Sequence, residues 1–279
     1  MRIGIIGVGK VGASLGQYLA HNNVMISGVF DINATTAATG ANLIKTVCFG
    51  NLEDLVATSD VLFITVVDDE IASVWKQIAV LDVAEKIICH CSGALASTIF
   101  TGIREKGAFG YSVHPAMTIS HSSAVGELER APFTIEGDSE RLAVVKDLFA
   151  AMGNSVQVLT AANKTRYHAA AVFASNFIVA LADISMDILA DCGFDKEQQR
   201  LFLPLMQASI DTIIKDGIVS ALTGPIERGD VGTVEKHLAN LSGNEREIYA
   251  LLSTKIIEIA KQKNPHKDYS DLATFLSKK

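Results

Sequence analysis

Residues 1–12 read Met-Arg-Ile-Gly-Ile-Ile-Gly-Val-Gly-Lys-Val-Gly, and residues 24–31 read Val-Met-Ile-Ser-Gly-Val-Phe-Asp. Each run supplies a short apolar strand, and after the first strand Gly7, Gly9 and Gly12 have the G-x-G-x-x-G spacing. In this spacing the first glycine makes a tight turn, and the second lets the backbone approach a pyrophosphate. The third lets a helix pack closely on the strand.

The predicted helix begins near Lys10, where its unpaired amides would face the phosphates of a bound ligand. Asp31 closes the second strand about twenty residues after the glycines, at the position of an acid that binds a ribose hydroxyl. A glycine-rich turn also serves ordinary packing of a helix on a strand, but here the strand, the helix and the acid are all present. The stretch therefore predicts a dinucleotide site formed by Gly7, Gly9, Lys10, Val11, Gly12 and Asp31.

Composition narrows the class of protein. A chain of 279 residues with 49% hydrophobic content can bury one large core or two moderate ones. The net charge of -7 gives no basic surface for nucleic acid. Neither the seven histidines nor the four cysteines have metal-ligand spacing, so no metal is expected. No signal peptide fits, and no apolar run spans a membrane without a charge or glycine. A soluble cytoplasmic protein without membrane partners is expected.

The first part of the chain has the pattern of an α/β fold. Up to about residue 160, β-branched runs alternate with helical stretches, which predicts a doubly wound, mostly parallel Rossmann sheet. The predicted strands are 2–6, 24–30, 45–48, 61–67, 86–91, 107–113, 132–136 and 155–159. The predicted helices are 10–21, 34–43, 51–57, 69–80, 94–105 and 139–152.

The strand pattern ends at residue 159, and the rest of the chain reads as helix. We therefore expect a dinucleotide-binding domain over 1–160 and an all-helical second domain over 161–279. One very long helix is predicted over 161–192, ending at Gly193, a natural C-cap. It is apolar nearly all round and must be buried, in its own domain or against a partner subunit. A homodimer through the helical domain is therefore expected. The later predicted helices are 196–217, 231–241, 243–263 and 268–277.

Candidate site residues follow the predicted strands, because an open parallel sheet binds ligands at the carboxyl ends of its strands. Val66 and Val67 come after one strand and are assigned to the cofactor. The next residues, Asp68 and Asp69, either belong to the ligand-binding loop or cap the following helix, and capping is favoured because aspartate is preferred at that position.

Ser92 and Gly93 follow the next strand and would lie beside a nicotinamide, although Ser92 could also cap a helix. His114 precedes Pro115, which enforces an extended backbone and would direct the imidazole into the cleft. A lone histidine is commonly structural, so both interpretations of His114 stay open.

The long helix carries a polar stripe. At 100° per residue, His168 and Ser175 lie within about 40° of Lys164, with Asn176 at the edge of the same face. Burying such groups unpaired would cost several kcal/mol, which favours an active site over simple packing. Lys164, His168 and Asn176 are the predicted catalytic residues, and Ser175 is assigned to the substrate.

A polar loop over 221–230 contains Thr223 and Arg228, both assigned to the substrate. The planar guanidinium of Arg228 could bind a carboxylate. Alternatively, Glu227, Arg228 and Asp230 form an ion network in the turn or cap the next helix.

The sequence resembles proteins that join a Rossmann-like domain to a DUF2520 domain. The resemblance is carried by Cys91-Ser-Gly-Ala94, by His114-Pro115, by residues 167–176 and by residues 223–230. It is more distantly similar to ketopantoate reductases, pyrroline-5-carboxylate reductases and the 6-phosphogluconate dehydrogenase-like enzymes. Some members of the resembled family are ketopantoate reductases, so the resemblance implies 2-dehydropantoate as substrate.

The chain departs from these relatives at two positions. They use a lysine and, one turn later, an asparagine; Lys164 matches the lysine, but His168 occupies the later position. Relatives that use NADPH carry Ser or Asn followed by Arg where this chain has Asp31. A carboxylate there favours a ribose hydroxyl and repels a 2′-phosphate. Asp31 therefore favours NADH, whereas the resemblance favours NADPH.

The sequence is interpreted as that of an NAD(P)H-dependent reductase of a small keto acid, above all 2-dehydropantoate. Lys164 or His168 would donate the proton, Asn176 and Ser92 would hold the carbonyl, and Arg228 would anchor the carboxylate. One alternative is an imine reductase of the pyrroline-5-carboxylate type. Another is a protein that senses NAD(P)H without catalysis.

Overall fold

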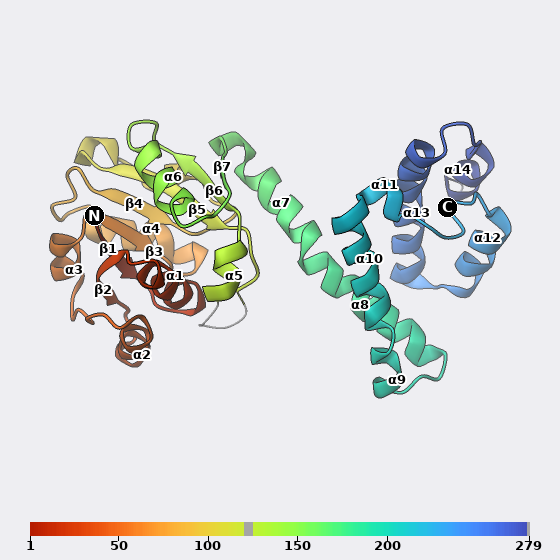
Figure 1. Ribbon diagram of the computed structural model, residues 1–279, viewed down its shortest axis with the longest axis horizontal. Helices are drawn as coiled ribbons and strands as arrows, with labels where there is room; N and C mark the ends of the chain where they lie inside the picture. Colours follow the sequence, from red (N-terminus) through yellow and green to blue (C-terminus); the bar gives the residue numbers. More distant parts are fainter. Residues whose placement is uncertain (120–124, 278–279) are drawn as a thin grey trace. The chain divides into compact units, whose positions relative to one another are not determined.

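The structure is a computed structural model that describes residues 1–119 and 125–277. Within these residues, seven strands form one sheet with the order β2-β1-β3-β4-β5-β6-β7 (Figure 1). Only β5 and β6 pair in antiparallel fashion. The predicted α/β fold with a mostly parallel sheet is confirmed. The strands are β1 (Arg2–Ile6), β2 (Met25–Phe30), β3 (Val61–Ile64), β4 (Ile87–His90), β5 (Phe109–Pro115), β6 (Phe133–Gly137) and β7 (Val156–Val158).

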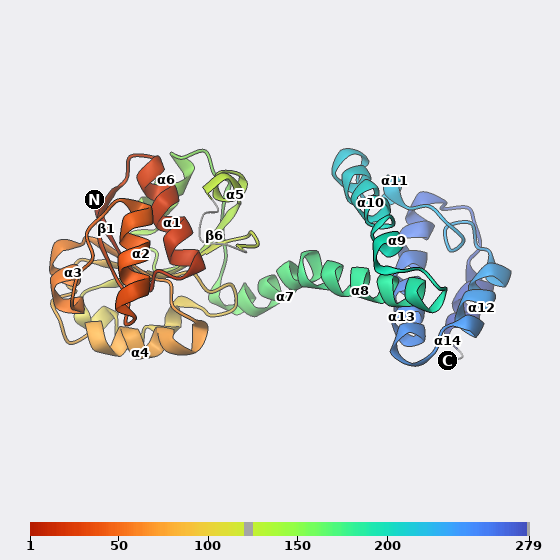
Figure 2. The same cartoon turned by 90° about the horizontal axis from the view of Figure 1, so that it is seen from below.

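Helices cover both faces of this sheet, as Figure 2 shows for α1 and α4. The central strands are apolar on both faces because successive side chains point to opposite sides. Ile5 joins a core cluster with α1 and α6, while Ile6 joins a second cluster with α3 and α4. The helices are α1 (Lys10–His21), α2 (Ala34–Ile44), α3 (Leu52–Thr58), α4 (Asp68–Ile78), α5 (Val125–Arg130), α6 (Leu142–Ala150) and α7 (Lys164–Ala174).

The strand order creates a crevice beside β1. The chain leaves β1 for β2 on one side and then crosses to β3 on the other, so the direction of winding reverses at β1. Ligands of open α/β sheets bind at this reversal, outside the carboxyl ends of the strands. The glycine turn follows the carboxyl end of β1 and therefore lies at that place.

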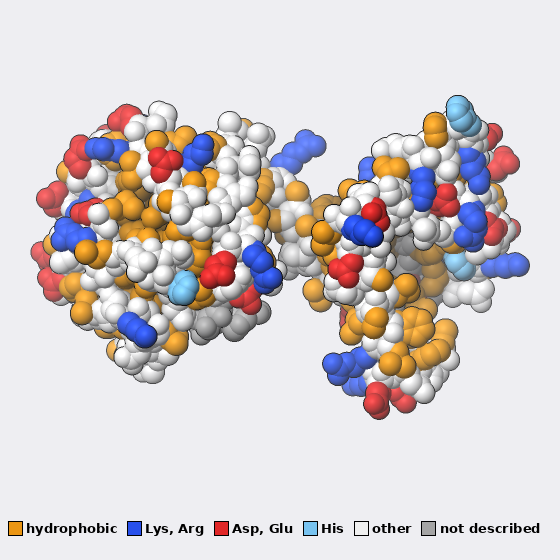
Figure 3. Space-filling model, viewed as in Figure 1, with side chains coloured by type: hydrophobic (Ala, Val, Ile, Leu, Met, Phe, Trp, Pro, Cys, Tyr) orange, Lys and Arg blue, Asp and Glu red, His pale blue; other side chains and the backbone are white. Residues whose placement is uncertain are grey.

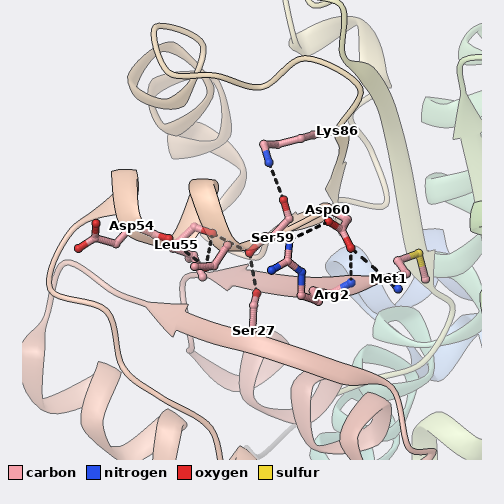
Figure 4. A network of polar contacts seen from close by, with 9 residues as sticks. Met1, Arg2, Ser27, Asp54, Leu55, Ser59, Asp60 and Lys86 are labelled. Carbon is pink, nitrogen blue, oxygen red and sulfur yellow. Dashed lines mark hydrogen bonds and ion pairs between the residues drawn. The ribbon is translucent and has the colours of Figure 1, made fainter.

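A polar network ties the opposite, amino ends of the strands (Figure 4). The backbone amide of Arg2 donates to Asp60 Oδ2 at 2.7 Å, and its guanidinium contacts Asp60 Oδ1 at 3.2 Å. These hydrogen bonds lower the pKa of Asp60. Lys86 Nζ donates to the carbonyl of Ser59 at 2.7 Å. The network joins β1, β3 and β4 at the edge away from the crevice, which gives it a structural role.

Two predicted elements of the sheet domain differ in the structure. Residues 45–48 form only an isolated bridge between Val29 and Cys48. The predicted helix over 94–105 is replaced by two 3-10 turns, Ser97–Ile99 and Arg104–Lys106. A helix cannot form here because Ser97 donates its amide and hydroxyl to Glu136, and because Gly102 has a φ of +73°.

The predicted long helix over 161–192 is wrong as one continuous element. It consists of a 3-10 turn (Ala161–Asn163), α7 and α8 (Asn176–Asp191), with non-helical dihedrals at Ser175 (φ -132°, ψ -74°). Ser175 Oγ donates to the carbonyl of Ala171 at 2.7 Å, a back-bonding contact that bends helices. The chain divides into compact units at this point, Met1–Ser175 and Asn176–Lys279, rather than at the predicted boundary of 160.

In the second unit, helices and the loops that join them make up the described residues, up to 277. The predicted helix over 196–217 is interrupted, since Pro204 in the first turn of α10 lacks the amide needed to continue a preceding helix. The core includes Val234 of α12 and Ile257 of α13. The remaining elements are α9 (Lys196–Arg200), α10 (Leu203–Asp216), α11 (Ile218–Ala221), α12 (Val231–Asn240), α13 (Gly243–Lys263) and α14 (Ser270–Ser277).

Helices α8 and α10 leave large apolar side chains uncovered. Val179, Leu205 and Ile214 are 71%, 67% and 79% exposed, and Figure 3 shows hydrophobic side chains gathered on the second unit. Taken as one segment, Ala161–Asp191 is long and apolar enough to cross a membrane by length and composition, with a mean hydropathy of 1.7 over an 18-residue window. The same segment contains acidic Asp183 and also Lys164, which is buried in the first unit.

Candidate active site

The three glycines of the opening motif have three different environments. Gly7 has a φ of +87°, and a Cβ there would lie 2.7 Å from a side-chain carbon of Val66. A Cβ at Gly12 would collide with the carbonyl oxygen of Gly7, whereas one at Gly9 would have no atom within 4 Å. The first glycine thus makes the turn, the third permits close packing, and the second leaves open space. This is the geometry that a bound pyrophosphate needs.

A cavity of about 560 Å³ adjoins the glycine turn. The predicted cofactor residues on its wall are Gly7, Gly9, Asp31, Val66 and Val67. Lys10 and Val11 begin α1 beside the turn, and Lys10 is exposed.

Helix α4 adds Glu70, Val74 and Gln77 to the wall of this cavity. Sequence reasoning missed these residues, although their spacing of four and three places them on one helix face. Asp31 and Glu70 give the wall two carboxylates, and no lysine or arginine of the described chain lines it.

Asp31 is held by two backbone amides. Its Oδ2 accepts from Val8 at 2.9 Å and its Oδ1 accepts from Asn33 at 2.9 Å. Asn33 in turn caps α2 by accepting from the amide of Thr36 at 3.0 Å. A carboxylate offers about four acceptor sites, so each oxygen can still accept from a ribose hydroxyl. The contacts therefore fix the carboxylate at the cavity wall and leave part of its hydrogen-bond acceptor capacity unused.

A second cluster lies at the carboxyl ends of β4 and β5, where Ser92 is its centre. Ser92 Oγ contacts Asp68 Oδ2 at 2.7 Å and accepts from the amides of Ala94 and Leu95. The capping interpretation is thus wrong for Ser92, whose hydroxyl stabilises a turn because no helix begins directly after it, and it is also wrong for Asp68 and Asp69. The N-cap residue of α4 is Val67, and it has no side-chain cap. Asp68 instead holds Ser92, because the loop after β4 lies against the start of α4.

Lys164 of α7 is 1% exposed, and its Nζ donates to the carbonyl of Ser92 at 3.0 Å. Burial lowers the pKa of Lys164 to about 8, against the opposing effect of the negative charges of Glu136 and Asp68. An ammonium group with a pKa near neutrality is suited to give up a proton during a reaction. The structure therefore places an ammonium group with a lowered pKa at the carboxyl ends of the strands.

Two histidines face Gly93. His114 Nε2 would lie 2.9 Å from a Cβ at Gly93, and His168 Nδ1 would collide with it. The imidazole rings are 6.1 Å apart between centroids. Among described residues, the buried His168 Nδ1 has no hydrogen-bond partner. Only a residue without a side chain fits here, because both imidazole rings lie against the Cα of Gly93.

His114 is fixed by a residue that sequence reasoning missed. Its Nδ1 lies 2.9 Å from the hydroxyl of Tyr167, which is on α7 beside Lys164. Burial, together with the positive charge of Lys164, lowers the pKa of His114 to about 4. His114 is therefore neutral at pH 7, and it can donate or accept a hydrogen bond.

His90 is another residue that the sequence did not single out. It ends β4, is fully buried, and its Nδ1 accepts from the amide of Ser92 at 3.2 Å. Burial lowers its pKa to about 4. A buried polar ring at the end of an apolar strand was the available signal, and the sequence reasoning treated this strand as ordinary core.

The remaining predicted residues lie at the end of the first unit or in the second unit. Ser175 ends the first unit, with its hydroxyl bound to the backbone of α7. Asn176, Thr223 and Arg228 belong to the second unit, and their assignments stay predictions.

In the loop over 221–230, the capping alternative is correct for Asp230. It accepts from the amide of Thr233 at 3.0 Å and from its hydroxyl at 2.7 Å. Glu227 binds Asn264 at 2.7 Å, which fixes the same loop. In the part of the chain that the structure describes, no group of three or more histidine, cysteine or acidic side chains is arranged to hold a metal ion.

Comparison with protein families agrees with this architecture. Residues 1–115 match the model of a Rossmann-like domain, and residues 131–256 match that of a domain of unknown function, DUF2520. The chain therefore joins a Rossmann-like domain to a DUF2520 domain, and the resemblance predicted from the sequence is confirmed. No curated protein matches the chain.

Several solved structures have a similar fold. Protein TM1727 from Thermotoga maritima has 27% identity and a TM-score of 0.76, with 94% of this chain and 99% of that chain covered. A reductive aminase from Aspergillus terreus in complex with NADPH has 18% identity and a TM-score of 0.67, with 98% of each chain covered. Plasmodium falciparum pyrroline carboxylate reductase with NADP bound has 15% identity and a TM-score of 0.61, with 94% and 96% covered.

Proposed function

We propose that this protein is an NAD(P)H-dependent oxidoreductase that reduces a small keto acid. The proposal rests on one observation: a cavity beside the glycine turn and a buried cluster of possible proton donors lie at the same edge of one sheet. Val66 and Val67 line the cavity, and the next residue, Asp68, holds Ser92 in the cluster. Similar folds occur in an NADPH-bound reductive aminase and an NADP-bound reductase, which supports nicotinamide chemistry.

The protein residues supply orientation and the proton. When bound, a reduced nicotinamide supplies the hydride. Lys164 would protonate the oxygen or nitrogen that gains electron density, with His168 as the other candidate. Ser92 and Asn176 would hold the reacting carbonyl, and His114, Ser175 and Thr223 would contact the substrate. The planar guanidinium of Arg228 would anchor a carboxylate.

The proposed substrate is 2-dehydropantoate, as the family resemblance implies. A second candidate is a cyclic imine of the pyrroline-5-carboxylate type, and the folds shared with a reductive aminase and a pyrroline carboxylate reductase favour it. Purified protein supplied with both compounds side by side, with oxidation of NADH and NADPH recorded, separates the two. A sensor would bind cofactor tightly and turn over neither compound.

NADH is the proposed cofactor. Asp31 and Glu70 bring two carboxylates to the cavity wall, where a 2′-phosphate would be repelled. The resemblance to NADPH-dependent relatives supports the opposite choice. Titration calorimetry with each cofactor tests the proposal. We expect NADH to bind at least about tenfold more tightly, a difference of about 1.4 kcal/mol, and Asp31→Ser to reduce that preference.

The exposed apolar side chains of the second unit bear on the oligomeric state of the protein. We propose that a second copy of this chain covers the apolar surface of α8 and α10. Large apolar side chains that remain exposed on a helix mark an interaction site. Cytoplasmic localisation, which the sequence predicts, remains a proposal.

A further inference from the structure

A buried carboxylate near the proposed active site has no role in the reaction described above. Glu136 of β6 is 5% exposed, and its two oxygens accept from the amide of Ser97 at 2.7 Å and from the Ser97 hydroxyl at 2.9 Å. Burying a carboxylate is costly unless hydrogen bonds and charges compensate. Two neutral donors satisfy part of its hydrogen-bonding capacity, and they do not balance its negative charge.

The pairing of β5 and β6 places this carboxylate beside the cluster. Ser112 is directly opposite Glu136 in the antiparallel register, so their side chains lie on the same face of the sheet. The hydroxyl of Ser112 donates to the carbonyl of Ser92 at 3.1 Å, and Lys164 Nζ donates to the same oxygen. Ser112 and Lys164 therefore share one backbone carbonyl, and Glu136 lies directly across the strand pair from Ser112.

Several other ionisable groups surround Lys164, but few of them are charged at pH 7. Burial raises the pKa of Cys91 to about 12 and lowers that of His90 and His114 to about 4, so these three groups are neutral. Tyr167 lies on α7 itself, with its ring 5.7 Å from Lys164 Nζ, and His168 of the same helix lies beside His114.

The acids that remain are Asp68 of α4 and Glu136. The carboxylate of Asp68 is engaged with Ser92 Oγ. The charge of Glu136 raises the pKa of Lys164 more than the charge of Asp68 does.

We propose that Glu136 is a positioning residue for Lys164. Glu136 holds the loop over 92–97, and its charge keeps the lysine ammonium protonated until the ammonium donates its proton. The inference rests on the proposed function, because it assigns Lys164 as the acid. It adds that the acid depends on a residue of β6, within the region matched by the DUF2520 model. The part of the chain matched by the Rossmann-like model does not contain it.

Glu136→Gln tests this proposal, because the amide can still bind Ser97 but carries no charge. Ser97→Ala is the matched control, since it removes one hydrogen bond and leaves the charge. In the ligand-free protein, an NMR titration of lysine labelled at Cε, with the Lys164 signal assigned by its loss in Lys164→Met, follows the ammonium directly. We expect Glu136→Gln to lower its midpoint by about one pH unit and Ser97→Ala to leave it unchanged.

The kinetic readout should follow the titration. In Glu136→Gln, the alkaline limb of the kcat profile should move to lower pH by about the same amount, with the KM for cofactor unchanged. An unchanged Lys164 midpoint in Glu136→Gln, or an equal shift in Ser97→Ala, would overturn the proposal. A shifted midpoint in a protein without reductase turnover would support the contact and contradict the proposed function, so the two failures are distinguishable.

Discussion

Gly93 is the residue on which the two histidines of the site depend. A methyl group there would collide with His168 Nδ1 and lie 2.9 Å from His114 Nε2. We predict that Gly93→Ala lowers kcat by at least tenfold, because a shift of about 1 Å in catalytic groups has effects of up to a hundredfold. Gly50→Ala is the control, since a Cβ at Gly50 meets no atom within 4 Å. Equal kcat values for Gly93→Ala and Gly50→Ala would refute the assignment of His114 and His168 to the active site.

His90 should link stability to pH. Its folded pKa of about 4 is below the ordinary value of 6.5, so between these values the unfolded chain binds a proton that the folded chain does not. The free energy of unfolding should therefore fall as the pH drops from 6.5 to 4, by roughly 3 kcal/mol for this one group.

His90→Asn keeps an acceptor for the amide of Ser92 and removes the titration. Urea unfolding at a series of pH values should give a shallower acid loss for this variant than for the wild type. Parallel curves would show that His90 does not titrate in this way.

At the residue scale, sequence reasoning found groups that a motif marks. Ser92, His114 and Lys164 follow strand ends or lie on a polar stripe, and the structure brings them together. Tyr167 and Glu136 could not be found in this way. Their positions depend on the register of β5 with β6 and on how α7 lies against the sheet, which are contacts between distant parts of the chain.

The glycine turn between β1 and α1 allows a test at the scale of one element. Gly9 has a φ of -66°, and a Cβ there meets nothing, whereas one at Gly12 collides with the Gly7 carbonyl. We predict that Gly9→Ala keeps the wild-type Tm but loses cofactor affinity by at least tenfold. Gly12→Ala should lower the Tm by several degrees, since it forces α1 away from β1.

Differential scanning calorimetry and NADH titration on the same samples make both measurements. A Gly9→Ala variant that binds NADH as the wild type does would show that no pyrophosphate passes over this turn.

The errors at the element scale have specific causes. Residues 94–105 have a helical composition, but Glu136, which is distant in sequence, takes the amide that a helix would use. The helix over 161–192 has a continuous apolar pattern, and Ser175 interrupts it through a hydrogen bond to Ala171. Periodicity reports on burial, and it does not register single side chains that compete for backbone groups.

At the scale of the whole molecule, the apolar surface of the second unit predicts a dimer. Sedimentation equilibrium should give twice the chain mass of 29.8 kDa. Val179→Glu should shift the protein toward the monomer, because a charge in an apolar interface is not compensated. Val80→Glu is the control, since Val80 is 79% exposed on the first unit and Val179 is 71% exposed on the second. A monomeric wild type, or one that instead binds lipid vesicles, would contradict the proposal.

The two-part organisation of the molecule follows from its sequence pattern, since strands stop near residue 159 and helices continue. The compact units divide later, after Ser175, because α7 belongs with the sheet domain. The buried Lys164 explains this attachment: its side chain is bound to the loop after β4, and periodicity alone could not reveal that contact.

The central claim is that Lys164 supplies the proton in a reduction that uses a nicotinamide cofactor. The most direct measurement is steady-state oxidation of NADH and NADPH with a panel of 2-keto acids and cyclic imines. Wild-type protein is compared with Lys164→Ala and His168→Ala. We expect the wild type to turn over at least one compound. In Lys164→Ala we expect kcat to fall by roughly a hundredfold or more, with cofactor binding retained. Wild-type rates in both variants, or tight cofactor binding with no turnover of any compound, would contradict the claim.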